Sequence, residues 1–210
     1  MSLFKFLLIS DSEILPLDTL ASFVKSLSRQ LPAGIVGVQI REKGLDSKTL
    51  LSYAKAVVEA LDDVSVKILV NDRLDIAVAS GAHGVHLPSS GLPPDAVRKH
   101  FKGIIGVSTH SLEELESLEP GIVDYATFGP VFETPRKVSF GPPQGTEKLR
   151  SGTSLARVPI IAIGGISEEN ACLLKGTGIS GVACIRAVLT SKDPASTVLR
   201  ILSDSGLLED

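Results

Sequence analysis

Short apolar runs alternate along the chain with segments whose apolar residues recur at helical spacing. The runs are rich in Val and Ile and apolar at nearly every position, which is typical of parallel strands covered on both faces. We expect strands at residues 4–10, 34–42, 66–73, 84–88, 103–110, 124–132, 158–166 and 181–189. The segments between and after them predict helices at residues 17–30, 46–60, 74–82, 93–101, 111–118, 145–157, 167–178 and 194–203.

Strands that alternate with helices in this way are joined by right-handed crossovers and form a parallel sheet. Eight repeats favour closure into a barrel, since an open doubly wound sheet more often has about five or six strands. No linker or low-complexity segment divides the chain. The sequence therefore predicts one α/β domain over residues 1–210, a (β/α)₈ barrel, with functional residues on the loops that follow the strands.

Composition and charge narrow the possible partners. Aromatic residues make up only 4% of the chain, so the core must be aliphatic, as in closely packed barrels. The net charge is −3 and there is no long basic run, which argues against a nucleic-acid partner. No apolar run reaches the ~20 residues needed to span a bilayer, and we expect a cytoplasmic protein. Barrels of this size often pair, which makes a homodimer the expected assembly.

Polar side chains follow the second predicted strand. Gln39, Arg41 and Lys43 are spaced two residues apart, so they share one face of an extended strand. If that face is the mouth of the barrel, an amide and two cations meet there, which suits a diphosphate or polyphosphate. The alternative is a solvated strand end at which Glu42 is the partner of the cations.

Two further residues end strands and are candidates for metal binding or proton transfer. Asp72 ends the third strand, and a carboxylate beside a phosphate site often holds Mg²⁺. The alternative is that Asp72 caps the next helix. His110 ends the fifth strand and could act as an acid or base, although a structural histidine with satisfied hydrogen bonds is the interpretation we favour. No two of the 4 histidines have metal-ligand spacing.

The loops after the last three strands carry groups suited to an anion. Gly164-Gly165 ends the seventh strand and Ile185-Arg186 ends the eighth, where many barrels bind phosphate. The longest break in the pattern, residues 133–144, follows the sixth strand. It contains a hydroxyl and two cations that could close over an anion, namely Thr134, Arg136 and Lys137. The alternative is an exposed flexible loop.

In their order and spacing, these residues resemble the thiamine phosphate synthase/TenI family. The matching blocks run from about residue 34 to residue 189 and read VQIREK, VNDR, GVHLP, IGVSTHS, FGPVFET, PPQG, IAIGGI and GVACIRA. The resemblance implies small phosphorylated substrates and a transferase that joins hydroxymethylpyrimidine diphosphate to a thiazole phosphate, with Mg²⁺ and release of pyrophosphate. Such a reaction requires fixed cations that stabilise a charged leaving group.

The resemblance also implies roles for individual residues. The diphosphate would be held by Gln39, Arg41, Lys43 and Asn71, with Ser108 as a hydroxyl on the diphosphate side. Asp72 resembles a Mg²⁺ ligand, and Thr134 and Lys137 resemble loop contacts to substrate. The thiazole phosphate would be received at Gly165, Ile185 and Arg186. The expected catalytic cations are Arg41, Lys43 and Lys137.

The chain departs from the family pattern at a few positions. Gly91 stands where the family usually has a second acidic residue that completes the Mg²⁺ site. Arg136 and Arg186 replace small hydroxyl residues, and as fixed cations we expect them to bind substrate and to compensate in part. TenI-type tautomerases carry a catalytic histidine where this chain has Pro130. A tautomerase and a non-catalytic paralogue that binds a thiamine precursor are the alternatives to the synthase.

Overall fold

Parallel strands close into a barrel in the computed structural model, which describes residues 3–134 and 142–208. The strands are β1 (Phe6–Ile9), β2 (Val36–Ile40), β3 (Lys67–Asn71), β4 (Gly84–Leu87), β5 (Ile104–Thr109), β6 (Tyr125–Phe128), β7 (Ile160–Ile163) and β8 (Gly181–Cys184). Each strand pairs with its neighbours in the sequence, and β1 also pairs with β8. The predicted (β/α)₈ barrel is confirmed.

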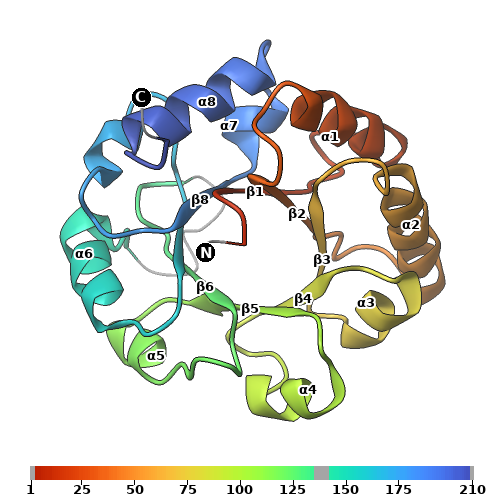
Figure 1. The fold of residues 1–210 in the computed structure, drawn as a ribbon, viewed down its shortest axis with the longest axis horizontal. Coiled ribbons are helices and arrows are strands. Elements are labelled where there is room, and N and C mark those ends of the chain that lie inside the picture. The colour runs from red at the N-terminus through yellow and green to blue at the C-terminus, as the bar shows by residue number, and fades with distance from the viewer. Residues whose placement is uncertain (1–2, 135–141, 209–210) are drawn as a thin grey trace.

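Helices form a ring around the strands (Figure 1). They are α1 (Leu20–Arg29), α2 (Ser47–Ala60), α3 (Leu74–Ser80), α4 (Pro94–His100), α5 (Leu112–Glu116), α6 (Gly145–Leu155), α7 (Arg186–Leu189) and α8 (Pro194–Asp204). Their apolar residues face the sheet at helical spacing, as Leu20, Val24 and Leu27 do on α1. No helix in the described part of the chain is long and apolar enough to cross a membrane.

Several predicted strands are shorter in the structure, such as residues 124–132, of which β6 covers only Tyr125–Phe128, and two predicted elements differ more. The helix expected at residues 167–178 is only a short 3₁₀ helix, η3 (Ala171–Leu174), which is followed by Gly176 and Gly178 in left-handed conformation. The strand expected at residues 181–189 stops at Cys184 and continues as α7. A short apolar run does not by itself distinguish a buried strand from a buried helix, and Val188 and Leu189 are buried as part of α7.

The barrel has two apolar layers because successive strand residues point to opposite faces of the sheet. The larger layer fills the space between the strands and the helices and includes Phe6, Leu8, Val38 and Val70. The smaller layer lies inside the barrel and consists of Phe4, Leu7, Ile9, Leu69, Tyr125, Ile161 and Ala183. Both faces of every strand are therefore covered, which explains why the strands read as continuous apolar runs.

An ion pair fastens α4 to the beginnings of β5 and β6. Arg98 Nη2 lies 2.5 Å from Asp124 Oδ2, and the two side chains are 20% and 35% exposed. The Arg98 guanidinium also donates to the backbone oxygens of Ile122 and Gly103. Asp124 accepts a further hydrogen bond from the Ile105 backbone N–H at 2.8 Å. One side-chain pair thus links α4 to the starts of two neighbouring strands, β5 and β6.

We expect Arg98→Met to lower the free energy of unfolding by about 2–3 kcal/mol, because it removes the cation from the half-buried Asp124 carboxylate and the donor from the carbonyl oxygens of Phe101, Gly103 and Ile122. Urea denaturation followed by circular dichroism measures the change. The matched control is Lys99→Met, which removes the next cation on α4; Lys99 lies 3.7 Å from Asp95 in an exposed pair. That control should cost less than about 0.5 kcal/mol. Equal losses in the two variants would contradict the role given to Arg98.

Candidate active site

An arc of polar side chains in two hydrogen-bonded groups lines the inside of the barrel on the neighbouring strands β2 to β6. Gln39 on β2 donates from Nε2 to Asn71 Oδ1 on β3 at 2.8 Å. His86 on β4 bonds through its two ring nitrogens to Ser108 on β5 and to Tyr125 on β6. Buried polar groups need partners, so these contacts allow polar side chains to fill part of an interior that is apolar elsewhere.

Among the described residues, a fully buried oxygen of this arc has no hydrogen-bond partner. Gln39 is 2% exposed, and its Oε1 lacks a hydrogen bond within the described part of the chain. Gln39 also lies deeper than predicted, inside the barrel, because it is a residue of β2 itself. Leaving a buried acceptor unsatisfied costs roughly 1–3 kcal/mol, so a bound molecule with an N–H or O–H group would gain that energy by supplying the donor.

Arg41 and Lys43 follow β2 and carry charge to the mouth of the barrel. Arg41 is half-buried and Lys43 is exposed, and neither forms an ion pair with any described residue. Glu42 between them is buried and accepts from Ser10 Oγ at 2.5 Å and from the Ser12 N–H at 3.2 Å. Glu42 is therefore not the partner of these cations, although the exposed Lys43 agrees with a solvated strand end.

The buried Glu42 carboxylate also holds the backbone that carries these cations. It binds the Ser10 hydroxyl, whose oxygen in turn accepts from the Arg41 backbone N–H at 2.9 Å. The loop after β2 is thereby tied to the loop after β1. Such an anchor restricts where the Arg41 and Lys43 side chains can reach, which is the preorganisation that electrostatic stabilisation needs.

Asp72 stands just beyond the end of β3 in a rare backbone conformation. Its φ is 64°, the sole positive value outside glycine among the described residues, and its N–H donates to His86 O at 2.8 Å. The N-cap of α3 is Arg73, and no side chain caps that helix. Asp72 therefore does not act as the helix cap. A side chain held in this conformation at a strand end is a common feature of functional sites.

No cluster of three or more His, Cys, Asp or Glu side chains that could hold a metal occurs in residues 3–134 and 142–208. Gly91 closes a turn in which its N–H donates to Pro88 O, so the loop after β4 offers no carboxylate at this position. A Mg²⁺ ion usually takes one or two protein carboxylates and completes its shell with phosphate oxygens and water. Asp72 fits that pattern as a single ligand beside a phosphorylated substrate.

A second region, formed by the loops after β6, β7 and β8, depends on two glycines. Gly164 and Gly165 have φ values of 102° and 67°, and a Cβ atom on Gly165 would clash with the backbone oxygen of Glu133. The Phe132 N–H donates to Gly164 O at 2.9 Å, which continues the β6–β7 pairing into the loops. Asn170 Nδ2 holds Gly165 O at 2.8 Å from the other side. The glycines thus let two loops approach closely.

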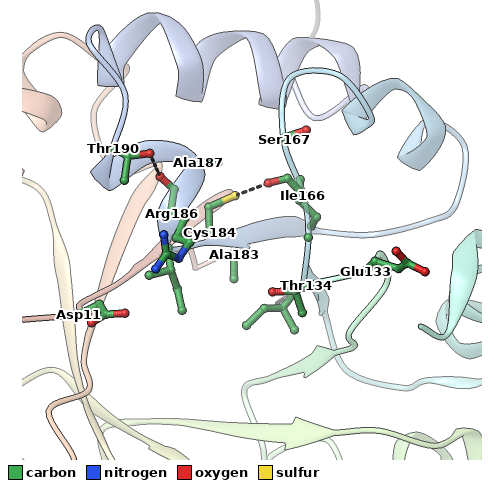
Figure 2. Close-up of a pocket in the computed structure, with 14 residues that line it drawn as sticks. Asp11, Glu133, Thr134, Ile166, Ser167, Ala183, Cys184, Arg186, Ala187 and Thr190 are labelled. Atoms are coloured by element: carbon green, nitrogen blue, oxygen red, sulfur yellow. Dashed lines mark hydrogen bonds between the residues drawn. The ribbon is translucent and has the colours of Figure 1, made fainter. Parts of the chain in front are cut away.

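These loops enclose a pocket of about 330 Å³. Four residues expected from the sequence line it: Thr134, Gly165, Ile185 and Arg186. Figure 2 shows Arg186, the first residue of α7, across the pocket from Thr134 and Glu133. Arg136 and Lys137, which complete the expected loop contacts, lie outside the described residues.

The structure also shows the roles of a histidine considered in the sequence and of several polar residues that the sequence did not single out. His110 Nδ1 donates to Gly129 O at 2.7 Å, which agrees with a structural histidine. The anchoring role of Ser10 and Glu42 had no signal in the sequence. Strand alternation is consistent with His86 and Tyr125 on the inner faces of their strands, since they lie two residues from Gly84 and Thr127, but it does not reveal their hydrogen bonds.

The fold and the placement of these groups define a (β/α)₈ barrel whose polar residues gather at the C-terminal ends of its strands, the face that carries the active site in such enzymes. The family model described as thiamine monophosphate synthase matches residues 6–188. The chain therefore belongs to the thiamine monophosphate synthase family.

Individual relatives agree. The thiamine-phosphate synthase of Chlorobium phaeovibrioides is 38% identical over 95% of both chains, and that of Archaeoglobus fulgidus is 38% identical over 78% of both. The thiamine phosphate pyrophosphorylase of Pyrococcus furiosus superposes with a TM-score of 0.83 at 27% identity, covering 97% of this chain and 96% of that one. The 3-hexulose-6-phosphate synthase of Salmonella typhimurium shares the fold alone. It superposes with a TM-score of 0.70 at 16% identity, covering 96% of this chain and 98% of that one.

We expect Gly165→Ala to weaken binding of thiazole phosphate about tenfold or more, because the added Cβ atom would push the loop after β7 away from Glu133. Isothermal titration calorimetry measures this. Gly176→Ala is the control, since Gly176 also has a positive φ (73°) but a Cβ there would meet no atom within 4 Å. If both variants bind equally well, the close approach of the loops does not shape the pocket.

Proposed function

We propose that this protein is a thiamine-phosphate synthase, a transferase that joins hydroxymethylpyrimidine diphosphate to thiazole phosphate and releases pyrophosphate. One observation carries the proposal. Arg41 and Lys43 follow β2, and neither cation has a carboxylate partner among the described residues. On the same strand, Gln39 has a buried oxygen without a hydrogen-bond partner in the described part of the chain. A substrate with an anionic diphosphate and an N–H donor on its ring complements both features, in a chain that belongs to the matching family.

The diphosphate is the leaving group, and its negative charge grows as the C–O bond to the pyrimidine methylene breaks. Arg41 and Lys43 would donate charge-assisted hydrogen bonds to its oxygens. Their positions are set by the Ser10–Glu42 anchor, so little reorganisation is needed when the charge develops. Lys137 is proposed as a third cation on the diphosphate. The thiazole phosphate then attacks the methylene cation.

The pyrimidine ring would lie against the polar arc inside the barrel. Gln39 Oε1 would accept from the ring amine, which satisfies the one unpaired acceptor of the arc. Asn71, held by Gln39, and Ser108, held by His86, would complete the contacts to the pyrimidine diphosphate. Buried amides and hydroxyls that are left unpaired without substrate discriminate strongly against analogues that lack the matching group.

The thiazole phosphate would occupy the pocket beside β7 and β8. Gly165 and Ile185 would approach the phosphate with backbone N–H groups, and Thr134 would contact it from the opposite loop. Arg186, and Arg136 in the loop after β6, add cations where the family usually has hydroxyl residues. The two substrates would thus be bound by separate groups on one face of the barrel.

Mg²⁺ is the proposed cofactor, and Asp72 is the residue that would hold it. When bound, the ion neutralises charge on the diphosphate. Because Gly91 provides no carboxylate, most of the remaining ligands would be diphosphate oxygens and water. For the molecule as a whole we propose a cytoplasmic homodimer, by analogy with other barrels of this size.

Lys43→Ala should lower kcat/KM for the diphosphate substrate by about a hundredfold, because it removes a cation from the leaving group. The assay supplies both substrates with and without Mg²⁺ and follows thiamine phosphate through its oxidised fluorescent product. Lys55→Ala, which removes an exposed lysine from the middle of α2, is the matched control and should leave the rate unchanged. A folded wild-type protein that binds thiazole phosphate but forms no product would overturn the synthase and lead to a tautomerase assay.

Asp72→Asn should raise the Mg²⁺ concentration for half-maximal activity about tenfold or more, since it removes the charged metal ligand. Asparagine tolerates a positive φ, so the substitution spares the backbone. The same titration on Asp75→Asn is the control, because the Asp75 carboxylate is paired with Arg73 at 2.5 Å. An unchanged Mg²⁺ requirement in Asp72→Asn would remove Asp72 from the metal site.

A further inference from the structure

Three side chains from β4, β5 and β6 form a hydrogen-bonded relay inside the barrel. Tyr125 Oη lies 2.7 Å from His86 Nδ1, and His86 Nε2 lies 2.9 Å from Ser108 Oγ. Tyr125 and His86 are 1% and 2% exposed, whereas Ser108 is only half-buried. Ser108 is therefore the end of the relay that is open to a bound molecule.

Packing, rather than the hydrogen bond, fixes the tyrosine ring. Phe4 meets Tyr125 edge-on with ring centroids 5.2 Å apart and an interplanar angle of 76°. On the other side, the ring covers Gly106, where any Cβ atom would clash with it. A phenylalanine at position 125 would keep these contacts and lose only the hydroxyl.

The hydroxyl proton of Tyr125 determines the direction of the relay. Within the described part of the chain, His86 Nδ1 is the sole hydrogen-bond partner of this hydroxyl. Burial raises the pKa of Tyr125, so the hydroxyl keeps its proton. If Nδ1 also carried a proton, the tyrosine proton would have no acceptor in a buried apolar setting, which is costly. Tyr125 therefore donates and Nδ1 accepts.

A histidine that accepts at Nδ1 carries its proton on Nε2. Nε2–H then donates to Ser108 Oγ and occupies one of its lone pairs. The hydroxyl hydrogen of Ser108 cannot point back to His86. No other described residue hydrogen-bonds to Ser108 Oγ, so this hydrogen is left for a molecule bound in the barrel mouth.

We propose that Tyr125 and His86 are positioning residues that make Ser108 a hydrogen-bond donor to the pyrimidine diphosphate. The proposal rests on the proposed synthase function for the identity of that substrate. It adds a defined direction to each bond of the relay and a requirement on the substrate. The atom that meets Ser108 must be an acceptor, either a ring nitrogen or a phosphate oxygen, because a donor there would face another donor.

A double-mutant cycle tests whether Tyr125 acts through Ser108. Tyr125→Phe should lower kcat/KM for the pyrimidine diphosphate about tenfold when Ser108 is present and less than about twofold in a Ser108→Ala background. The matched control is Tyr53→Phe, which removes a buried hydroxyl that has no hydrogen-bond partner among the described residues and should change nothing. The same factor in both backgrounds would overturn the proposal.

Nuclear magnetic resonance tests the relay without turnover. In protein labelled with ¹⁵N-histidine, the imidazole nitrogens of His86 should show the proton on Nε2, and Tyr125→Phe should abolish that preference. The chain has 4 histidines, so His86 is assigned by elimination with asparagine variants of the other three: His83, His100 and His110. A proton on Nδ1 in the wild type would overturn the relay. A wild type with the Nε2 proton but no synthase activity would instead leave the relay standing and reject the proposed function.

Discussion

The polar side chains inside the barrel must find hydrogen-bond partners there, because the closed ring of strands and its shell of helices separate them from water. This requirement explains why the interior polar residues occur in contacting groups on adjacent strands, Gln39 with Asn71 and His86 with Ser108 and Tyr125. The same requirement determines which polar atoms remain without a partner inside the barrel. Once these contacts are made, an oxygen of Gln39 and the hydroxyl hydrogen of Ser108 remain for a ligand.

The charged and glycine-rich parts of the site depend on the loops, and different interactions hold each loop. Behind Arg41, a buried carboxylate of Glu42 ties the loop after β2 to Ser10. Around Gly165, the absence of a side chain lets the loops after β6 and β7 touch, and Asn170 holds the contact. Val131 and Ile166 also bury the loops after β6 and β7 in the apolar core, so the contact at Gly165 adds to that packing and does not replace it.

Much of this arrangement follows from the sequence. The strands were predictable because a parallel barrel buries both strand faces, and the spacing of Gln39 from Arg41 placed both on one face. The ends of the strands and helices were harder to predict, since an apolar run such as residues 181–189 does not reveal where β8 ends and α7 begins. His86 was ambiguous for another reason. A single histidine in an apolar strand has the same pattern whether it packs passively or bonds across two strands, and its partners Ser108 and Tyr125 depend on a register that the sequence does not specify.

The distribution of charge in the proposed site sets how the leaving group would be stabilised. Carboxylates close to a diphosphate are useful only when a metal ion lies between them, since otherwise like charges repel. This chain has Asp72 after β3 and a glycine, Gly91, in the loop after β4, while the buried Glu42 carboxylate accepts hydrogen bonds from Ser10 and Ser12. The balance beside the diphosphate therefore shifts towards Arg41 and Lys43. In the proposed function, cations carried by the protein need no metal ion to position them, and the Ser10–Glu42 contact ties down the loop that carries them.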